Sequence, residues 1–279
     1  MRLIRKIDEM RKYVRERKNK KLIGFVPTMG YLHEGHLSLI RKARRECDEV
    51  IVSIFVNPTQ FGRGEDYHSY PRDLKRDIAL SEKEKVDVIF APSVEEMYPE
   101  GYSTFVQVEG RLSSVLEGAS RPGHFRGVCT VLVKLFNIIN PDISFFGEKD
   151  FQQALIVKKM VEDLNIDTRI VLLPTVREED GLAMSSRNSY FNKEERKAAI
   201  ILYRSLKKAK EWIDQGERNS SRIIQKMKDF IAKEPLARID YIAIVDSKSL
   251  EEVEQVERGN LIALAVYIGK VRLIDNMRV

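Results

Sequence analysis

The sequence predicts an α/β protein in which a doubly wound parallel sheet is followed by a smaller α+β domain. Three observations lead to this class. Short apolar runs rich in Val, Ile, Leu and Phe recur along the first two-thirds of the chain, as in strands that are covered on both faces. Segments with helical periodicity separate these runs, and the rhythm changes after Pro174. We therefore expect one domain over residues 1–175 and a second over residues 176–279.

The elements of the first domain alternate along the chain. A charged amphipathic stretch with Ile4, Ile7 and Met10 predicts an N-terminal helix. Apolar runs predict strands over residues 22–26, 50–56, 86–91, 142–146 and 170–173, and the periodic stretches between them predict helices over 37–45, 71–83, 127–139 and 151–164. In such a sheet, ligands bind at the carboxyl ends of the strands. Residues 104–109 predict a strand that, with a short helix after it, forms an insertion.

The second domain has a different pattern. Two strongly charged stretches predict helices over residues 193–213 and 220–233, and three apolar runs predict strands over 239–245, 261–268 and 270–274. Gly269 and Lys270, between the last two strands, are compatible with a tight hairpin.

Composition excludes several classes of protein. The net charge of +6 could indicate a nucleic-acid partner, but Lys and Arg alternate with Glu and Asp along the helices, so we expect none. The longest nearly apolar stretch, residues 128–139, contains Lys134 and is too short to cross a membrane, so we expect no membrane partner. Cys47 and Cys129 are the two cysteines, which favours a reducing cytoplasm over a disulfide framework.

The segment His33-Glu34-Gly35-His36 follows the first strong strand and a Pro-Gly turn. Strand, loop and helix in this order place two imidazoles and several backbone N–H groups at a helix N-terminus, where anionic phosphate binds readily. We favour phosphate binding over ordinary packing histidines. A zinc site is disfavoured because the spacing is one residue short of H-E-x-x-H, and no third ligand follows nearby.

Polar clusters follow four of the predicted strands. They comprise Pro27-Thr28-Met29-Gly30 with the two histidines, Asn57-Pro58-Thr59-Gln60-Phe61-Gly62, Gly147-Glu148-Lys149-Asp150-Phe151-Gln152-Gln153, and Pro174-Thr175-Val176-Arg177-Glu178 with Met184-Ser185-Ser186-Arg187-Asn188. Core packing does not require these residues, so we expect them to converge on one crevice. No G-x-x-x-x-G-K-[ST] loop is present, and Gly62-Arg63-Gly64 lacks the third glycine of a dinucleotide fingerprint. Side chains and helix N-termini must therefore recognise phosphate.

Six of these pieces, in this order, closely resemble the pantothenate synthetase (pantoate–β-alanine ligase) family. They are Pro27-Thr28-Met29-Gly30, His33-Glu34-Gly35-His36, Asn57-Pro58-Thr59-Gln60-Phe61, Phe146-Gly147-Glu148-Lys149-Asp150, Gln152-Gln153 and Met184-Ser185-Ser186-Arg187-Asn188. The resemblance extends over residues 21–192. It implies a Rossmann-like fold of the nucleotidyl-transfer group with an H-x-G-H signature, and a C-terminal lid domain.

The resemblance also implies a reaction. ATP, pantoate and β-alanine would be the substrates, Mg²⁺ would accompany ATP, and pantoate would be activated as pantoyl adenylate before the amine displaces AMP. A substrate carboxylate is already a nucleophile, so the chemistry requires in-line positioning and neutralisation of phosphate charge. The resemblance implies a homodimer as well. It does not identify direct metal ligands.

Site residues follow position by position from the resemblance. His33 and His36 would contact the phosphates, with His36 as the proton donor in adenylation, and Lys149 would be the third catalytic residue. The ATP site would comprise Met29, Gly30, His33, Gly35, His36, Gly147, Glu148, Lys149, Asp150, Val176, Met184, Ser185, Ser186 and Arg187. The pantoate and β-alanine sites would comprise Asn57, Gln60, Arg121 and Gln153, with the match at Arg121 looser than the others.

Two further interpretations come from the residues themselves. Asp73 and Asp77 are spaced as a metal pair would be, but a solvated helix face is favoured. The segment 184–188 is expected to close over ATP as a lid, with Gly181 as its hinge, although it could also be a turn before the helix at Lys193. The segment departs from that of the related synthetases, because it carries Ala183 and no leading lysine. The resemblance therefore implies that Ser185, Ser186 and Arg187 take the role of that lysine.

Two rival functions remain to be distinguished. A plain nucleotidylyltransferase would join ATP to a phosphate acceptor and would need no amine. An RNA-binding module would show a basic stripe with stacking aromatic residues, which the sequence lacks.

Overall fold

The computed structural model describes residues Met1–Val279, and the chain divides into two compact units. The first unit comprises Met1–Glu109, Arg121–Glu148 and Gln152–Pro174. The second comprises Gly110–Ser120, Lys149–Phe151 and Thr175–Val279. Two short segments from the first two-thirds of the chain therefore belong to the same unit as the C-terminal residues.

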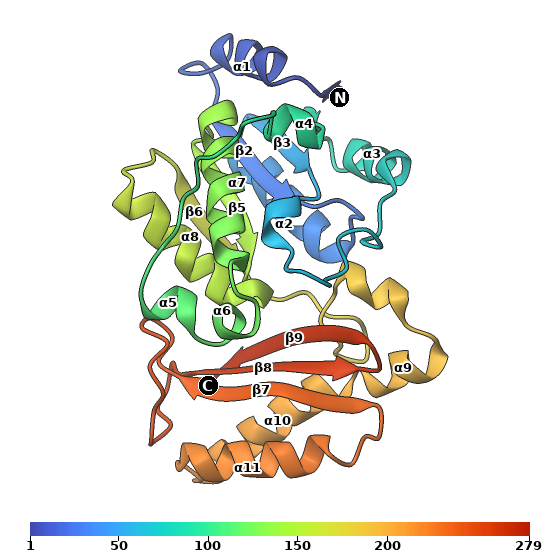
Figure 1. Cartoon of the computed structure of the whole chain (residues 1–279), viewed down its shortest axis with the longest axis vertical. Helices are drawn as coiled ribbons and strands as arrows, with labels where there is room; N and C mark the ends of the chain where they lie inside the picture. The colour runs from blue at the N-terminus through green and yellow to red at the C-terminus, as the bar shows by residue number, and fades with distance from the viewer. The chain divides into compact units, whose positions relative to one another are not determined.

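A six-stranded parallel sheet forms the centre of the first unit (Figure 1). Its spatial order is β1 (Arg2–Ile4), β4 (Val88–Phe90), β3 (Glu49–Ile54), β2 (Ile23–Thr28), β5 (Ile143–Gly147) and β6 (Arg169–Leu173). The five strands predicted from apolar runs are all present. The prediction of a helix from Ile4 onward was wrong at its start, because Ile4 lies in β1 and pairs with Phe90 of β4.

Helices cover both faces of this sheet, which confirms the doubly wound class. Phe25 of β2 packs edge-on against Phe136 of α7 (His124–Ile139), with ring centroids 6.3 Å apart. Its neighbour Val26 belongs instead to the apolar cluster that includes Ile40 of α2 (Glu34–Glu46). Adjacent strand residues point to opposite faces, so α7 and α2 lie on opposite sides of the sheet.

The first unit has six further helical elements. They are α1 (Ile7–Arg15), η1 (Pro58–Gln60), α3 (Leu74–Lys83), α4 (Val94–Met97), η2 (Glu148–Asp150), whose last two residues belong to the second unit, and α8 (Phe151–Asp163), whose first residue belongs to the second unit. The strand predicted over residues 104–109 is absent. That stretch is extended, but Val106 N–H donates to the Thr130 hydroxyl at 3.0 Å rather than to a neighbouring strand. The short helix expected after it is present as α5 (Arg111–Ser114).

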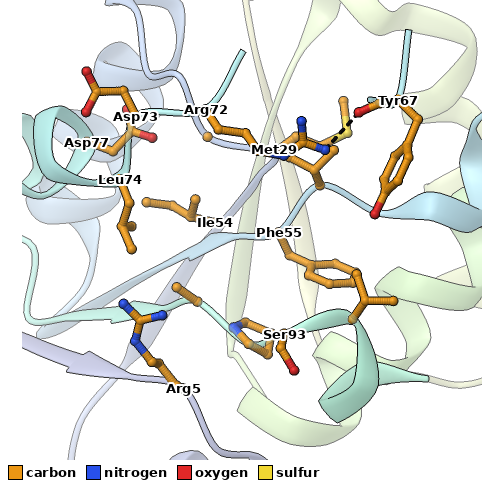
Figure 2. A pocket seen from close by; sticks show the side chains of 15 residues that line it. Arg5, Met29, Ile54, Phe55, Tyr67, Arg72, Asp73, Leu74, Asp77 and Ser93 are labelled. Carbon is orange, nitrogen blue, oxygen red and sulfur yellow. Dashed lines mark hydrogen bonds between the residues drawn. The ribbon is translucent and has the colours of Figure 1, made fainter. Parts of the chain in front are cut away.

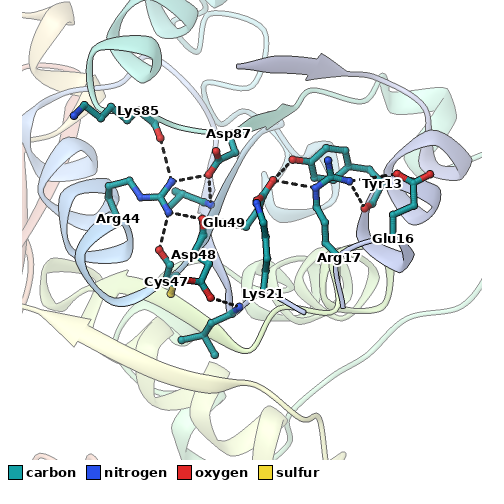
Figure 3. A network of polar contacts seen from close by, with 12 residues as sticks. Tyr13, Glu16, Arg17, Lys21, Arg44, Cys47, Asp48, Glu49, Lys85 and Asp87 are labelled. Carbon is teal, nitrogen blue, oxygen red and sulfur yellow. Dashed lines mark hydrogen bonds and ion pairs between the residues drawn. The ribbon is translucent and has the colours of Figure 1, made fainter. Parts of the chain in front are cut away.

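A polar network lies at the amino end of β3 (Figure 3). The buried Glu49 carboxylate accepts hydrogen bonds from the Tyr13 hydroxyl, from Arg17 Nε at 3.2 Å and from Lys21 Nζ at 2.7 Å. Nearby, Arg44 pairs with Asp87 at 2.6 Å. Tyr13 lies on α1 and Arg17 lies just after it. These contacts therefore hold that helix at the amino ends of the strands, away from their carboxyl ends.

The second unit is built on an antiparallel sheet of β7 (Ala237–Val245), β8 (Leu261–Ile268) and β9 (Val271–Arg278). Gly269 and Lys270 form the tight hairpin that the sequence predicted, because Ile268 pairs with Val271. The other elements are α5, α6 (Glu117–Ser120), η3 (Ser186–Tyr190), α9 (Lys193–Ala198), α10 (Ile201–Asp214) and α11 (Ser220–Ile231). The single helix predicted over 193–213 is thus divided in two.

The second unit has an apolar core of its own. It brings together Leu202 and Leu206 of α10, Met227 of α11, and Ile262 and Leu264 of β8, all at most 1% exposed. The short insertion joins this unit through Glu117, which receives a bidentate ion pair from Arg272 of β9 at 2.8 and 2.7 Å. No helix of either unit combines the length and the apolar composition needed to cross a membrane.

Candidate nucleotide and substrate site

The two histidines of the H-x-G-H segment cap the start of α2. His33 is the N-cap residue, and its Nδ1 accepts a hydrogen bond from Gly35 N–H at 3.2 Å. Nδ1 of His36 accepts from His33 N–H at 3.3 Å, and the two ring centroids lie 4.0 Å apart. A neutral imidazole that accepts at Nδ1 carries its proton on Nε2. Both rings therefore have Nε2 as their donor, beside the positive end of the helix dipole.

Asp77 fixes the loop before these histidines, a role that the sequence did not predict. The Asp77 carboxylate accepts from Tyr31 N–H at 2.8 Å and from Leu32 N–H at 2.7 Å, and it is 1% exposed. Burial raises the pKa of Asp77 despite these hydrogen bonds. The expectation of a solvated helix face holds for Asp73, which is exposed and caps α3 through Arg76 N–H. It was wrong for Asp77, which is buried and anchors the loop before His33.

A cavity of about 260 Å³ opens beside this loop (Figure 2). Met29 and Gly30, both predicted for the ATP site, contribute to its wall. Ile54 and Phe55 line it from the carboxyl end of β3. The cavity therefore lies at the strand edge where a doubly wound sheet binds its ligands.

The turn from Asn57 to Gln60 follows β3 and is densely hydrogen-bonded. Asn57 Nδ2 donates to Gln60 Oε1 at 3.0 Å and to Gly127 O at 3.1 Å. Its Oδ1 accepts from the Tyr98 hydroxyl at 2.8 Å and from the Thr59 hydroxyl at 2.9 Å. An amide offers two donor hydrogens and two acceptor lone pairs, so Asn57 has used its whole capacity within the protein. It orients the Gln60 amide, which also donates from Nε2 to Met29 Sδ at 3.2 Å.

Arg121 lies just before α7 and is held by a carboxylate. Its Nε and Nη2 donate to the two oxygens of Glu65 at 2.8 and 2.7 Å. Burial would raise the pKa of Glu65, but the hydrogen bonds and charge of Arg121 outweigh it and hold the pKa below its ordinary value. Arg121 Nη1 also contacts Nε2 of His124 at 3.1 Å, and Nδ1 of His124 contacts Gln60 O at 2.8 Å. The structure thus links the expected substrate residues Arg121 and Gln60 through His124.

The polar cluster from Gly147 to Gln153 has residues in both units. Gly147 ends β5, and a Cβ at this position would meet no atom within 4 Å, so no neighbour in the structure requires a glycine there. Glu148 begins η2, and Gln153 lies in the first turn of α8 and is half-buried. These three residues belong to the first unit, whereas Lys149 and Asp150 belong to the second.

Lys149 is positioned by the last strand of the chain. Its backbone oxygen accepts from Asn276 Nδ2 of β9 at 2.8 Å, and its ammonium lies 4.0 Å from the Asp150 carboxylate. The neighbouring Asp275 is 3% exposed and accepts both arms of the Arg177 guanidinium at 2.6 and 2.9 Å.

Residues 184–188, called the serine segment below, form a hydrogen-bonded turn of the second unit. Met184 N–H donates to Val176 O at 3.0 Å, so these two predicted ATP residues are neighbours. Ser185 Oγ accepts from Arg187 N–H at 3.3 Å as the cap of η3, in which Ser186 is buried. Asn188 Nδ2 closes the turn by donating to Ala183 O at 3.2 Å.

Gly181, the expected hinge of the lid, packs tightly against Tyr203. Its φ is +99°, and a Cβ there would lie 2.0 Å from the Tyr203 ring. The Arg177 guanidinium lies 4.4 Å from the centre of that ring and donates to Gly181 O at 3.1 Å. The glycine therefore permits a close packing contact.

Several of these residues escaped the sequence interpretation. Glu65, Tyr98 and Gly127 support the Asn57–Gln60 turn from elsewhere in the chain, and neither periodicity nor a local motif distinguishes them. The only available signal for Gly127 was its position near the start of a predicted helix. No group of three or more His, Cys, Asp or Glu side chains is placed to hold a metal ion.

Comparison with known proteins gives a consistent result over the whole chain. The sequence profile described as pantoate-beta-alanine ligase matches residues 2–278. The pantothenate synthetase of Carboxydothermus hydrogenoformans is 58% identical over 277 residues, which cover 99% of this chain and 98% of that protein. A crystal structure of pantothenate synthetase from Thermus thermophilus has a TM-score of 0.95 at 48% identity, covering 100% and 99% of the two chains. The pantoate-beta-alanine ligase of Francisella tularensis, crystallised with β-γ ATP and β-alanine, has a TM-score of 0.83 at 38% identity, covering 100% and 97%.

Proposed function

The chain belongs to the pantoate–β-alanine ligase family, and from this premise we propose that it condenses (R)-pantoate with β-alanine through a pantoyl-adenylate intermediate. ATP is cleaved to AMP and pyrophosphate. The observation that carries the adenylate step is the histidine pair at the start of α2, where two Nε2 donors accompany a helix N-terminus. The relative from Francisella tularensis crystallised with β-γ ATP and β-alanine supports the two substrate classes.

The first step is an in-line substitution at phosphorus. A pantoate carboxylate oxygen bonds to the α-phosphorus, the bond to the bridging oxygen breaks, and pyrophosphate leaves. Negative charge on the phosphate oxygens is the main barrier, so donors aimed at them supply most of the catalysis. His36 and His33 supply such donors in the first unit, and we assign the ammonium of Lys149 the same task.

The second step transfers the acyl group. The β-alanine nitrogen bonds to the adenylate carbonyl carbon, the bond from that carbon to the phosphate oxygen breaks, and AMP leaves. The proton of the amine passes to solvent. No enzyme nucleophile is needed in either step, because the carboxylate and the amine are nucleophiles themselves.

The proposed ligands follow the sequence assignments within each unit. In the first unit, Met29, Gly30, His33, Gly35, His36, Gly147 and Glu148 contact ATP; in the second, Lys149, Asp150, Val176, Met184, Ser185, Ser186 and Arg187 do so. Gln60 and Gln153 bind pantoate, and Gln60 lies near β-alanine. Asn57 and Arg121 belong to the substrate site through their hydrogen-bond connections to Gln60.

Mg²⁺ enters as part of the MgATP substrate. This ion binds one or two carboxylates together with substrate phosphates and waters rather than a closed protein cage. The absence of any cluster of three candidate ligands fits that mode of binding. The exposed Asp150 carboxylate, beside Lys149, is the predicted ATP residue best suited to reach a nucleotide-bound cation.

We also propose that the protein is a homodimer, as the family resemblance implies, and that it works in a reducing cytoplasm. The two cysteines, Cys47 and Cys129, are both free and buried, as expected where disulfides do not form. Light scattering would give a mass of about twice the 32.3 kDa chain for a dimer. A mass of one chain at micromolar concentration would contradict the dimer.

Isotope exchange tests the proposed chemistry. With MgATP and pantoate but no β-alanine, the enzyme is expected to exchange labelled pyrophosphate into ATP, because the first step needs no amine. A reaction without pantoate is the control. Adding β-alanine should then yield pantothenate and AMP in equal amounts. Exchange that requires β-alanine would contradict the adenylate, and a dinucleotide product would indicate a nucleotidylyltransferase instead.

A further inference from the structure

His124, at the start of α7, is buried beside the turn that presents Gln60. It is 8% exposed, and its Nδ1 lies 2.8 Å from Gln60 O. A carbonyl oxygen can only accept, so Nδ1 carries the proton and donates it. Nε2 lies 3.1 Å from Arg121 Nη1. A guanidinium can only donate, so Nε2 has no proton and accepts. These two contacts together admit one state of the ring, the neutral Nδ1–H tautomer.

The orientation of Arg121 is fixed in turn by Glu65. The bidentate ion pair uses Nε and Nη2, which leaves Nη1 directed at the imidazole. Planar fork-to-fork pairing of this kind restricts direction as well as distance. A continuous chain of hydrogen bonds therefore runs from a carboxylate through a guanidinium and an imidazole to the backbone of Gln60.

The first turn of α7 holds the same peptide from a second side. A Cβ on Gly127 would lie 2.3 Å from Thr59 O and 2.5 Å from Gln60 N, so the helix backbone touches the peptide before Gln60. Gly127 O accepts from Asn57, which holds the Gln60 side chain. Both the backbone and the amide of Gln60 are thus held from α7.

We propose that His124 is a positioning residue for pantoate binding, which it secures by holding Gln60 through its Nδ1–H tautomer, with Arg121 and Glu65 fixing that tautomer. This inference rests on the proposed function, in which Gln60 binds pantoate. In this role His124 acts through Gln60 rather than through a contact of its own with the substrate. Without the hydrogen bond from His124, the Gln60 carbonyl and its turn could move. A displacement of the Gln60 amide by less than about 1 Å would already weaken its hydrogen bond to pantoate.

Three variants separate positioning from packing. His124→Leu removes the donor and is expected to raise the KM for pantoate about tenfold, with the KM for ATP within twofold of the wild type. His124→Asn keeps a donor near the place of Nδ1 and is expected to restore the KM for pantoate to within about threefold. His68→Leu, at an exposed histidine outside the Gln60 turn, is the matched control and should leave both constants unchanged. Initial rates with each substrate varied in turn give these values.

The tautomer of His124 can be measured in the wild-type protein, so the result does not depend on whether a variant folds. The chain has 4 histidines, so the protein labelled with ¹⁵N-histidine gives few ring signals, and the signal missing from His124→Asn identifies His124. We expect protonated Nδ1 and unprotonated Nε2 in the wild type. Protonation of Nε2 would overturn the proposal even if His124→Leu did not fold.

The kinetic outcomes also separate this proposal from the function on which it rests. If the wild type makes pantothenate and His124→Leu has an unchanged KM for pantoate, the positioning role is wrong and the function stands. Equal losses of kcat in the Leu and Asn variants, without a change in KM, would assign His124 to packing alone. A wild type that makes no pantothenate would overturn both.

Discussion

His33 and His36 each use Nδ1 to accept a backbone hydrogen bond at the start of α2. One pair of side chains therefore stabilises the helix and presents two Nε2 donors. Simple alanine variants would mix these two effects, because loss of an N-cap costs about 1 kcal/mol of folding free energy. Asparagine is among the best N-cap residues but cannot supply the ring donor, which allows the effects to be separated.

We predict that His33→Asn keeps the stability of the wild type, whereas His33→Ala loses about 1 kcal/mol in urea unfolding. Both variants, and His36→Ala, should lose on the order of 100-fold in turnover, the scale for removal of a charge-stabilising donor. Steady-state rates and unfolding curves on the same samples give the comparison. Turnover in His33→Asn close to that of the wild type would make His33 a cap only.

Gly181 provides a second prediction at this scale. Gly181→Ala places a methyl group within 2.0 Å of the Tyr203 ring and at a φ of +99°. We expect a loss of about 3 kcal/mol, from strain and overpacking together. The matched control is Gly216→Ala, where φ is +103° but no atom lies within 4 Å of the added Cβ, so a loss of about 1 kcal/mol is expected. Equal losses at the two sites would show that the contact with Tyr203 contributes nothing.

At the scale of elements, α1 is held to β3 through the Glu49 carboxylate (Figure 3). Burial alone would raise the pKa of Glu49, but hydrogen bonds from Lys21 and Tyr13 and the nearby positive charges hold it below its ordinary value. A carboxyl group whose pKa is lowered by folding stabilises the protein above its unfolded pKa, about 4.3. That contribution disappears as the pH falls through the lowered pKa of the folded state.

Glu49→Gln should therefore destabilise the protein by about 2 kcal/mol at pH 7, because Arg17 and Lys21 lose their counter-charge. The difference from the wild type should shrink as the pH is lowered from 5 to 3. Urea unfolding at a series of pH values measures it. Glu100→Gln, at an exposed carboxylate outside this network, controls for general charge effects. A difference that stays constant down to pH 3 would contradict the assignment.

The elements also show what the sequence could and could not predict. Strands β2 to β6 were found because buried parallel strands are nearly continuous in apolar residues, a local signal. β1 was missed because three residues carry no periodicity, and Ile4 fitted the helical pattern of its neighbours equally well. The strand expected over 104–109 failed because β-branched and aromatic residues are compatible with any extended backbone, whether or not a partner strand is present.

The site was predictable where short motifs encode local geometry, as in the capping histidines. It was not predictable where the support comes from distant positions. Glu65 reaches Arg121 across 56 positions, and Asn276 reaches Lys149 across 127. Hydrogen bonds of that kind depend on the tertiary fold, and no spacing rule in a single sequence reveals them.

In the whole molecule, the residues proposed to bind ATP come from both compact units. Each unit has its own apolar core, so each can hold its share of the ligands rigidly. The residues from Met29 to His36 belong to the first unit, and those from Met184 to Arg187 belong to the second. The role of the second set rests on the proposal that the serine segment binds nucleotide.

Hydrogen exchange with and without a non-hydrolysable ATP analogue tests that role. The structure already pairs Met184 N–H with Val176 O and caps η3 with Ser185, so some protection is expected in the free protein. If the segment closes over ATP, protection over residues 180–190 should rise on binding, because local opening then requires release of the nucleotide. Residues 29–36 should gain protection as well, and β8, buried in the core of the second unit, is the internal reference.

The variant Arg187→Ala tests whether Arg187 binds the nucleotide or only stabilises the turn. If the Arg187 guanidinium binds phosphate, its removal should lower the affinity for ATP about tenfold and leave the KM for pantoate nearly unchanged. Loss of a turn alone would leave both KM values unchanged and lower only the stability. Protection that rises over residues 29–36 but not over 180–190 would confine nucleotide binding to the first unit and reduce the serine segment to a static turn before α9.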